Sequence, residues 1–123
     1  MTSASLYDRV GGDAFFVELV DRFYDGVAAD PRLRPMYPQD LTDSRRHLAL
    51  FLMQYWGGPK AYGEERGHPR LRMRHAPHRI DDLARDAWLA HMHDALDAMA
   101  MDDDVREALT DYLEMAAGQL RNA

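Results

Sequence analysis

The segment Arg66 to Ile80 reads Arg-Gly-His-Pro-Arg-Leu-Arg-Met-Arg-His-Ala-Pro-His-Arg-Ile and carries three of the chain's six histidines. Pro69 suits the first turn of a short helix, because the N–H group that proline lacks would have no partner there. Pro77 is placed to end that helix, so we expect His75 near a helix C-terminus. One imidazole nitrogen can then donate to a free carbonyl while the other stays available as a base or a metal ligand. Spacing alone leaves a second interpretation open, in which His75 only caps the helix.

Composition limits the class of protein. The 123 residues suffice for one domain, spanning residues 1–123, with a core of its own. The absence of cysteine excludes disulfides, thiolate nucleophiles, iron–sulfur clusters and haem attached through a Cys-x-x-Cys-His motif. A formal net charge of -6 argues against nucleic-acid binding, although fourteen arginines leave room for local anion contacts. We recognise neither a signal peptide nor an integral membrane segment, and therefore expect a cytoplasmic protein.

Apolar residues recur at intervals of three and four along most of the chain, and we find no convincing alternating strand. This pattern predicts four long helices, over Ala14 to Ala28, from Thr42 or Asp43 to Tyr55, from Asp81 or Asp82 to about Ala100, and from Asp102-Asp103-Asp104 to about Leu120. The remaining predictions are a short helix within Ser5 to Val10, a helix cap at Asp13, a turn over Arg32 to Tyr37 and a loop over Lys60 to His68. The predicted class is all-α.

Three polar-tipped aromatic residues fall on the inward stripes of predicted helices: Tyr24, Tyr55 and Trp88. Taken singly, each is well explained as a core residue that bonds to a backbone carbonyl. Together with His75 they allow a second interpretation. A cavity between helices with a histidine on one wall and hydrogen-bond donors on the other is what a gas ligand on haem iron requires.

Seven groups of residues add a stronger signal: Gly11-Gly12, Phe23-Tyr24, Tyr37-Pro38, Gln54 to Pro59, Arg66 to Pro77, Ala87-Trp88 and Tyr112 to Ala116. Their order and near-matching spacing closely resemble the group II truncated haemoglobins along nearly the whole chain. The resemblance implies a globin-like two-over-two helical sandwich enclosing haem b, with much of the proximal helix replaced by a loop.

By the same resemblance, His75 is the proximal iron ligand. Tyr24, Tyr37 and Trp88 lie on the distal side, where their donors would stabilise the partial negative charge of bound oxygen and slow its release. Ser44 and Leu48 match the two distal-helix positions that face the ligand. Ser44 there either leaves a gate to solvent or adds a weak hydroxyl donor. The side chains expected to contact haem are His75, Tyr37, Leu48, Phe51, Arg72, Arg74 and His78.

Haem carries two propionates, and four arginines flank the ligand histidine: Arg66, Arg70, Arg72 and Arg74. We expect one or two of them to contact propionate, the others forming a solvated basic face. His47 occupies a distal-helix position where the family often has an arginine.

The first functional hypothesis is a haem protein that reversibly binds oxygen and other diatomics such as CO and NO, as a monomer or homodimer. Nitric oxide dioxygenation and peroxidase-like turnover use the same pocket and stay open as activities, and a dioxygenase needs an external reductase. The alternative is a haem-free helical module that binds a partner. Colour distinguishes the two, because the module would purify colourless and bind no added hemin.

Overall fold

The computed structural model describes residues 4–123, which contain seven α-helices, one short 3-10 helix and no strand. The elements are α1 (Leu6–Arg9), α2 (Asp13–Ala28), η1 (Arg34–Met36), α3 (Thr42–Tyr55), α4 (Ala61–Arg66), α5 (Leu71–His75), α6 (Asp82–Asp97) and α7 (Asp103–Leu120). The all-α prediction is confirmed, and the four long helices begin and end close to their predicted positions. Within the described residues, no helix combines the length and the apolar character needed to cross a membrane.

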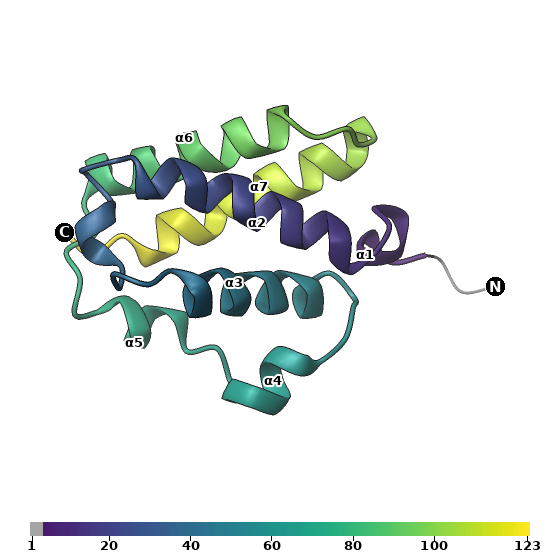
Figure 1. Ribbon diagram of the computed structural model, residues 1–123, viewed down its shortest axis with the longest axis horizontal. Helices are drawn as coiled ribbons and strands as arrows, with labels where there is room; N and C mark the ends of the chain where they lie inside the picture. Colours follow the sequence, from purple (N-terminus) through teal and green to yellow (C-terminus); the bar gives the residue numbers. More distant parts are fainter. Residues whose placement is uncertain (1–3) are drawn as a thin grey trace.

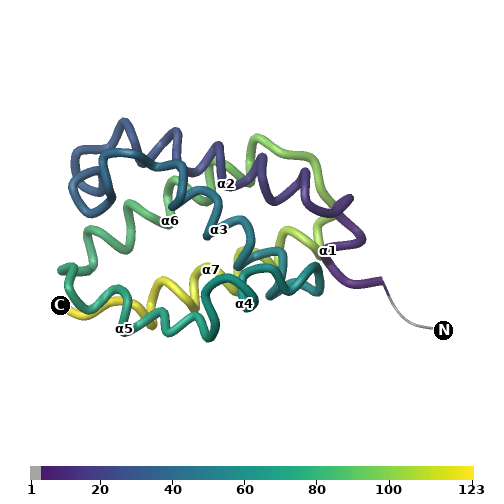
Figure 2. The backbone as a smooth tube through the Cα atoms, turned by 60° about the horizontal axis from the view of Figure 1, so that its bottom comes forward, coloured from purple at the N-terminus to yellow at the C-terminus, as the bar shows by residue number. Residues whose placement is uncertain are grey.

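The long helices form two pairs, α2 with α3 and α6 with α7, and α2 connects the pairs because it also packs against α6 (Figure 1). At the α2–α6 crossing the helices approach so closely that a Cβ atom on Gly26 would lie 2.4 Å from Nδ1 of His91. Glycine at position 26 is therefore needed for the two helices to pack this closely. The short helix α4 packs against α3 and α5 packs against α7, on the same side of the molecule (Figure 2).

The inward stripe of α2 is the centre of the core. Phe16, Leu19 and Phe23 are completely buried along it, at the three-and-four spacing of a helix face. They pack with fully buried residues of the other long helices, including Leu52, Met92, Leu96 and Leu109. The apolar pattern in the sequence thus identified the surfaces that hold the two pairs together.

Three local predictions were wrong. Asp13 does not cap α2: Gly12 precedes the helix, and the Asp13 carboxylate accepts a hydrogen bond from the Tyr7 hydroxyl instead, at 2.6 Å. The predicted loop over residues 60–68 contains α4, which has no apolar period but buries Tyr62. Pro69 lies before α5 rather than in its first turn, because the helix begins at Leu71.

Candidate functional site

A cavity of about 290 Å³ lies between α3 on one side and α6 and α7 on the other, and residues of η1, α4 and α5 complete its lining. Of the ten residues predicted to form a site, eight line this cavity: Tyr24, Tyr37, Ser44, Leu48, Phe51, Arg74, His75 and Trp88. The other two lie elsewhere. Arg72 lines a second cavity and His78 is exposed at the surface.

His75 is the last residue of α5, as its position before Pro77 predicted. Its Nδ1 lies 2.6 Å from the carbonyl oxygen of Leu71, one turn earlier. A carbonyl oxygen only accepts, so Nδ1 donates in this bond, and in the neutral imidazole Nε2 is then the nitrogen with the lone pair. The backbone of α5 therefore orients the ring so that Nε2 is the candidate metal-binding atom.

The C-terminal tail holds the turn that follows His75. The Asn122 side chain donates to the carbonyl of His78 at 2.8 Å and accepts from the Ile80 N–H at 2.8 Å. The Asn122 N–H in turn donates to the Ile80 carbonyl at 2.8 Å. These bonds join the start of α6 to the end of the chain, and so fix the segment that carries the histidine.

Three aromatic side chains with polar tips meet at the other side of the cavity. The rings of Tyr24 and Tyr37 lie edge to face with centroids 5.6 Å apart, and Phe23 packs between Tyr24 and Trp88. Burial raises the pKa of Tyr24 far above its ordinary value. Burial also raises the pKa of Tyr37 to about 12, although a hydrogen bond with Trp88 offsets part of the rise. Both phenols therefore keep their hydrogens at neutral pH and can donate.

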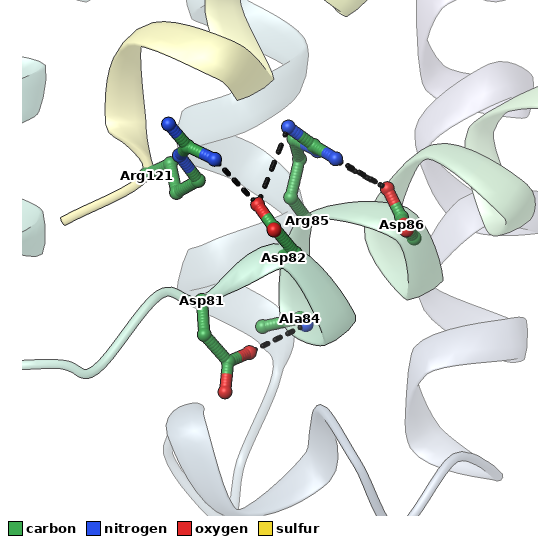
Figure 3. Close-up of polar contacts among 6 residues, drawn as sticks. All are labelled: Asp81, Asp82, Ala84, Arg85, Asp86 and Arg121. Atoms are coloured by element: carbon green, nitrogen blue, oxygen red, sulfur yellow. Dashed lines mark hydrogen bonds and ion pairs between the residues drawn. The ribbon is translucent and has the colours of Figure 1, made fainter. Parts of the chain in front are cut away.

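Three arginines line the cavity, and they differ in what neutralises them. Arg85 pairs with Asp86 at 3.0 Å and with Asp82 at 3.5 Å, and Asp82 also binds Arg121 (Figure 3). Arg66 and Arg74, by contrast, have no carboxylate within ion-pair distance anywhere in residues 4–123. The cavity wall therefore carries two guanidinium charges that the described part of the chain leaves unbalanced.

Arg66 contacts a neutral partner. Its guanidinium lies 2.8 Å from Nδ1 of His47, and burial together with the Arg66 charge lowers the pKa of that imidazole. The Arg66 Nε is buried and finds no hydrogen-bond partner in residues 4–123. A buried donor without an acceptor is costly, so this cation fits an anionic group of a molecule held in the cavity.

The donor set indicates the kind of molecule. Within the described range, no three side chains of histidine, cysteine, aspartate or glutamate converge on one point. A histidine that offers a single ring nitrogen to an apolar cavity fits a metal whose other ligands come with a macrocycle. One free imidazole nitrogen, two unbalanced arginines and a largely apolar lining together fit haem with its two propionates.

Sequence reasoning missed part of this wall. Tyr62, only 4 % exposed, lines the cavity and packs edge to face on Phe51 at 5.4 Å, but it lies in the segment predicted as a loop. Tyr55 was placed on an inward stripe, and this was wrong: it is 51 % exposed and packs on Tyr112 outside the cavity. Tyr62 is an aromatic residue in a polar segment bounded by glycines. This was the one sequence feature that could have indicated its burial.

Comparison with known proteins identifies the fold. The model of the family "Bacterial-like globin" matches residues 5–122. The chain is 45 % identical over 116 residues to group 2 truncated hemoglobin YjbI of Bacillus subtilis, covering 94 % of this chain and 87 % of that protein. The structure of a thermostable hemoglobin from the actinobacterium Thermobifida fusca is similar, with a TM-score of 0.95 and 52 % identity over 98 % of each chain.

A group II truncated hemoglobin from Bacillus anthracis gives a TM-score of 0.94 at 38 % identity, again over 98 % of both chains. The two helix pairs, the short α5 and the cavity between the pairs agree with this likeness. The chain therefore belongs to the bacterial-like globin family as a truncated haemoglobin with the two-over-two helical fold, a membership that implies haem-based oxygen binding.

Proposed function

We propose that this chain holds haem b through Nε2 of His75 and reversibly binds oxygen, and other diatomic gases such as CO and NO, on the opposite side of the iron. The observation that carries the proposal is the 2.6 Å hydrogen bond from Nδ1 of His75 to the Leu71 carbonyl. It fixes the tautomer in which Nε2 is the free nitrogen, on the wall of an apolar cavity. Ferrous haem supplies the metal to which such a nitrogen and a gas molecule bind.

The aromatic side of the cavity supplies hydrogen-bond donors. Tyr24, Tyr37 and Trp88 all line it, and the two phenols, which are protonated at neutral pH even at their ordinary pKa, are kept so over a wider pH range because burial raises the pKa of each. A donor aimed at a partly negative ligand contributes about 1 kcal/mol or somewhat more. Two such donors would slow ligand release roughly ten- to a hundredfold. A similar structure from Bacillus subtilis, 43 % identical, is described as an oxygen-avid haemoglobin, which supports this assignment.

Arg66 and Arg74 are the side chains we assign to the two propionates. Both line the cavity without a carboxylate partner in residues 4–123, whereas two aspartates already neutralise Arg85. Arg72, the other arginine expected from the sequence, lines a different cavity. A guanidinium that exchanges water for a propionate forms charge-assisted hydrogen bonds and anchors the edge of the macrocycle.

Nitric oxide dioxygenation and peroxidase-like turnover would use the same cavity. Each reaction consumes electrons at every turnover, so each would need an external reductant or reducing substrate. We therefore propose gas binding as the primary function and these reactions as secondary ones.

The test is a titration with hemin followed by absorption spectroscopy. The protein should give a saturable Soret band at one hemin per chain, and after reduction with dithionite the band should shift when CO is added. His75→Ala should lose or alter this spectrum. A protein that binds hemin no better than an unrelated helical protein of the same net charge would overturn the proposal.

A further inference from the structure

A second cavity of about 380 Å³ lies beside the first, between the C-terminal half of α3, residues 68–72 and α7. The two cavities share five lining residues, Phe51, Leu71, Tyr112, Ala116 and Leu120, so one layer of side chains separates them. Nothing in the proposed function uses the outer cavity. Its residues form a recess that differs in chemistry from the inner cavity.

The floor of the outer cavity is aromatic and partly exposed to water. The rings of Tyr55 and Tyr112 lie with centroids 4.1 Å apart and planes inclined by 33°. Trp56 supports Tyr112 from the side, edge to face at 5.8 Å. Tyr55 is 51 % exposed and Met115, which also lines the recess, is 49 % exposed. At this separation the Tyr55 and Tyr112 rings stack on each other, and the exposed part of the pair offers an aromatic edge and an outer face on which another aromatic ring can pack.

The rim of the same cavity is cationic. Arg70 and Arg72 both line it, both are exposed, and neither forms an ion pair with any carboxylate of residues 4–123. Other exposed arginines are neutralised, as Arg22 is by Glu18 and Arg121 by Asp82. Two unbalanced guanidiniums over an aromatic floor, in a chain of net charge -6, form a local site for an anion.

The backbone at Arg70 supports this interpretation independently. Its φ of 49° makes it the one non-glycine residue of positive φ among residues 4–123. Glycine or asparagine adopts this conformation at lower cost, so folding alone gives no reason for an arginine here. The strained backbone is held by a bond from the Arg70 N–H to Nδ1 of His68, at 3.2 Å, and by one from the Arg74 N–H to the Arg70 carbonyl, at 3.0 Å. Strain retained at a cavity rim is typical of binding sites.

We propose that the outer cavity binds a small aromatic carboxylate. One or two fused rings lie against Tyr55 and Tyr112, and the carboxylate is bound by Arg70 and Arg72. The volume of the outer cavity suits a ligand of that size. The positive charge of the rim favours a ligand whose negative group lies at the rim. The site shares part of its lining with the inner cavity, but Arg70 and Arg72 line the outer cavity alone, and the proposal does not rest on the haem assignment.

The test uses 1-naphthoate as the probe and the methionine methyl groups as reporters, in protein loaded with hemin, reduced and saturated with CO. Met115 lines the outer cavity only, and Met36 lines the inner cavity only. With 13C-labelled methionine methyls, naphthoate should shift the Met115 signal saturably and leave Met36 in place. The double variant Arg70→Ala, Arg72→Ala should bind about tenfold more weakly.

Two controls separate charge from site. The variant Arg22→Ala, Arg106→Ala removes the same two charges elsewhere on the surface and should bind naphthoate as the parent does. Gln119→Trp fills the outer cavity from an exposed position of α7 and should abolish the Met115 shift.

The proposal is overturned if Met115 shows no saturable shift, if Met36 shifts in its place, or if neutral 1-naphthalenemethanol binds as tightly as naphthoate. Hemin loading is measured separately, by the Soret band. If loading fails, the same titration on the unloaded protein still distinguishes Met115 from Met36, so each proposal can fail without the other.

Discussion

Nδ1 of His75 and the carbonyl oxygen of Leu71 are 2.6 Å apart, across a single turn of a helix only five residues long. The backbone of α5 thus orients the imidazole directly, without a carboxylate between them. In the proposed haem complex, this bond would hold the ring in the orientation that leaves Nε2 for the iron.

His75→Gly should reduce hemin affinity by on the order of a hundredfold or more, because it removes the only imidazole that lines the cavity from α5. Free imidazole at millimolar concentration should then restore the CO-bound spectrum, since the substitution leaves space where the ring was. The exposed His78 and His68 provide matched controls: His78→Ala and His68→Ala should keep the parent spectrum. A loss of the spectrum in His78→Ala would mean that the ligand is misassigned.

Tyr24→Phe and Trp88→Phe should each raise the oxygen dissociation rate by about five- to tenfold, because each removes one donor of about 1 kcal/mol. The first change keeps the ring that packs on Phe23 and Tyr37. Stopped-flow displacement of oxygen by CO measures the rate. Tyr55→Phe, on the outer surface, is the control and should leave it unchanged. If both cavity variants release oxygen at the parent rate, the hydrogen-bonding assignment fails.

Arg66→Gln and Arg74→Gln should each speed hemin loss by about three- to tenfold, because each removes a charge-assisted bond to a propionate. Arg72→Gln removes the same charge from the same segment but outside the inner cavity, and should have no effect. Transfer of hemin to excess apomyoglobin gives the rate. Faster loss in Arg72→Gln would show that Arg72 also binds a propionate, as the sequence led us to expect of both Arg72 and Arg74.

Arg72 and Arg74 show what a sequence can and cannot decide. Residues two apart on a helix point to different sides, so only one of the pair faces the cavity, and the sequence does not say which. The long helices were predictable because their apolar stripes repeat over four or more turns. His75 was predictable because Pro77 fixes the end of α5, one residue after its C-cap at Ala76.

The short helix α4 was not predictable for a physical reason. Its six residues show no apolar period, and contacts with α3 stabilise it: the Gln54 side chain accepts from the Gly63 N–H at 2.8 Å, and Tyr62 packs on Phe51. Tyr55 was misplaced because it continues the stripe of Leu48 and Phe51 but is the last residue of α3, where its side chain is 51 % exposed. Periodicity finds a stripe but does not say where along the helix that stripe stops being covered.

Ser44→Leu should slow the association of CO by about threefold or more if this side of the cavity is the entry route, because the added side chain narrows the wall that Ser44 lines. Ser44→Ala separates the two roles of this residue. It keeps the small volume and removes the hydroxyl, so it should leave association unchanged and raise oxygen dissociation only if the hydroxyl donates. Flash photolysis measures both rates. An equal or faster association in Ser44→Leu would place the route elsewhere.

The Asp30 carboxylate should make the stability of the fold depend on pH in the acid range. This carboxylate, only 6 % exposed, accepts bonds from the Arg32 guanidinium and backbone and from Nε2 of His91 at 2.7 Å, and so joins the end of α2 to α6. These bonds, those of Arg32 first, hold the pKa of Asp30 well below its ordinary value of 3.8. The folded state therefore favours the charged form.

Because the pKa of Asp30 is lower in the folded state, the direction of the pH effect on stability is fixed. Asp30 stabilises the fold fully above the pKa of the unfolded chain, near 3.8, and this contribution is lost as pH falls toward the lower folded pKa. Asp30→Asn should thus be less stable than the parent in urea at neutral pH, with a gap that narrows only below about pH 4. Asp25→Asn, which removes one charge from an exposed pair with Arg45, should change stability little at any pH. A gap for Asp30→Asn that stays constant down to the lowest pH at which the protein folds would show that the bonds, and not the charge, account for the role of Asp30.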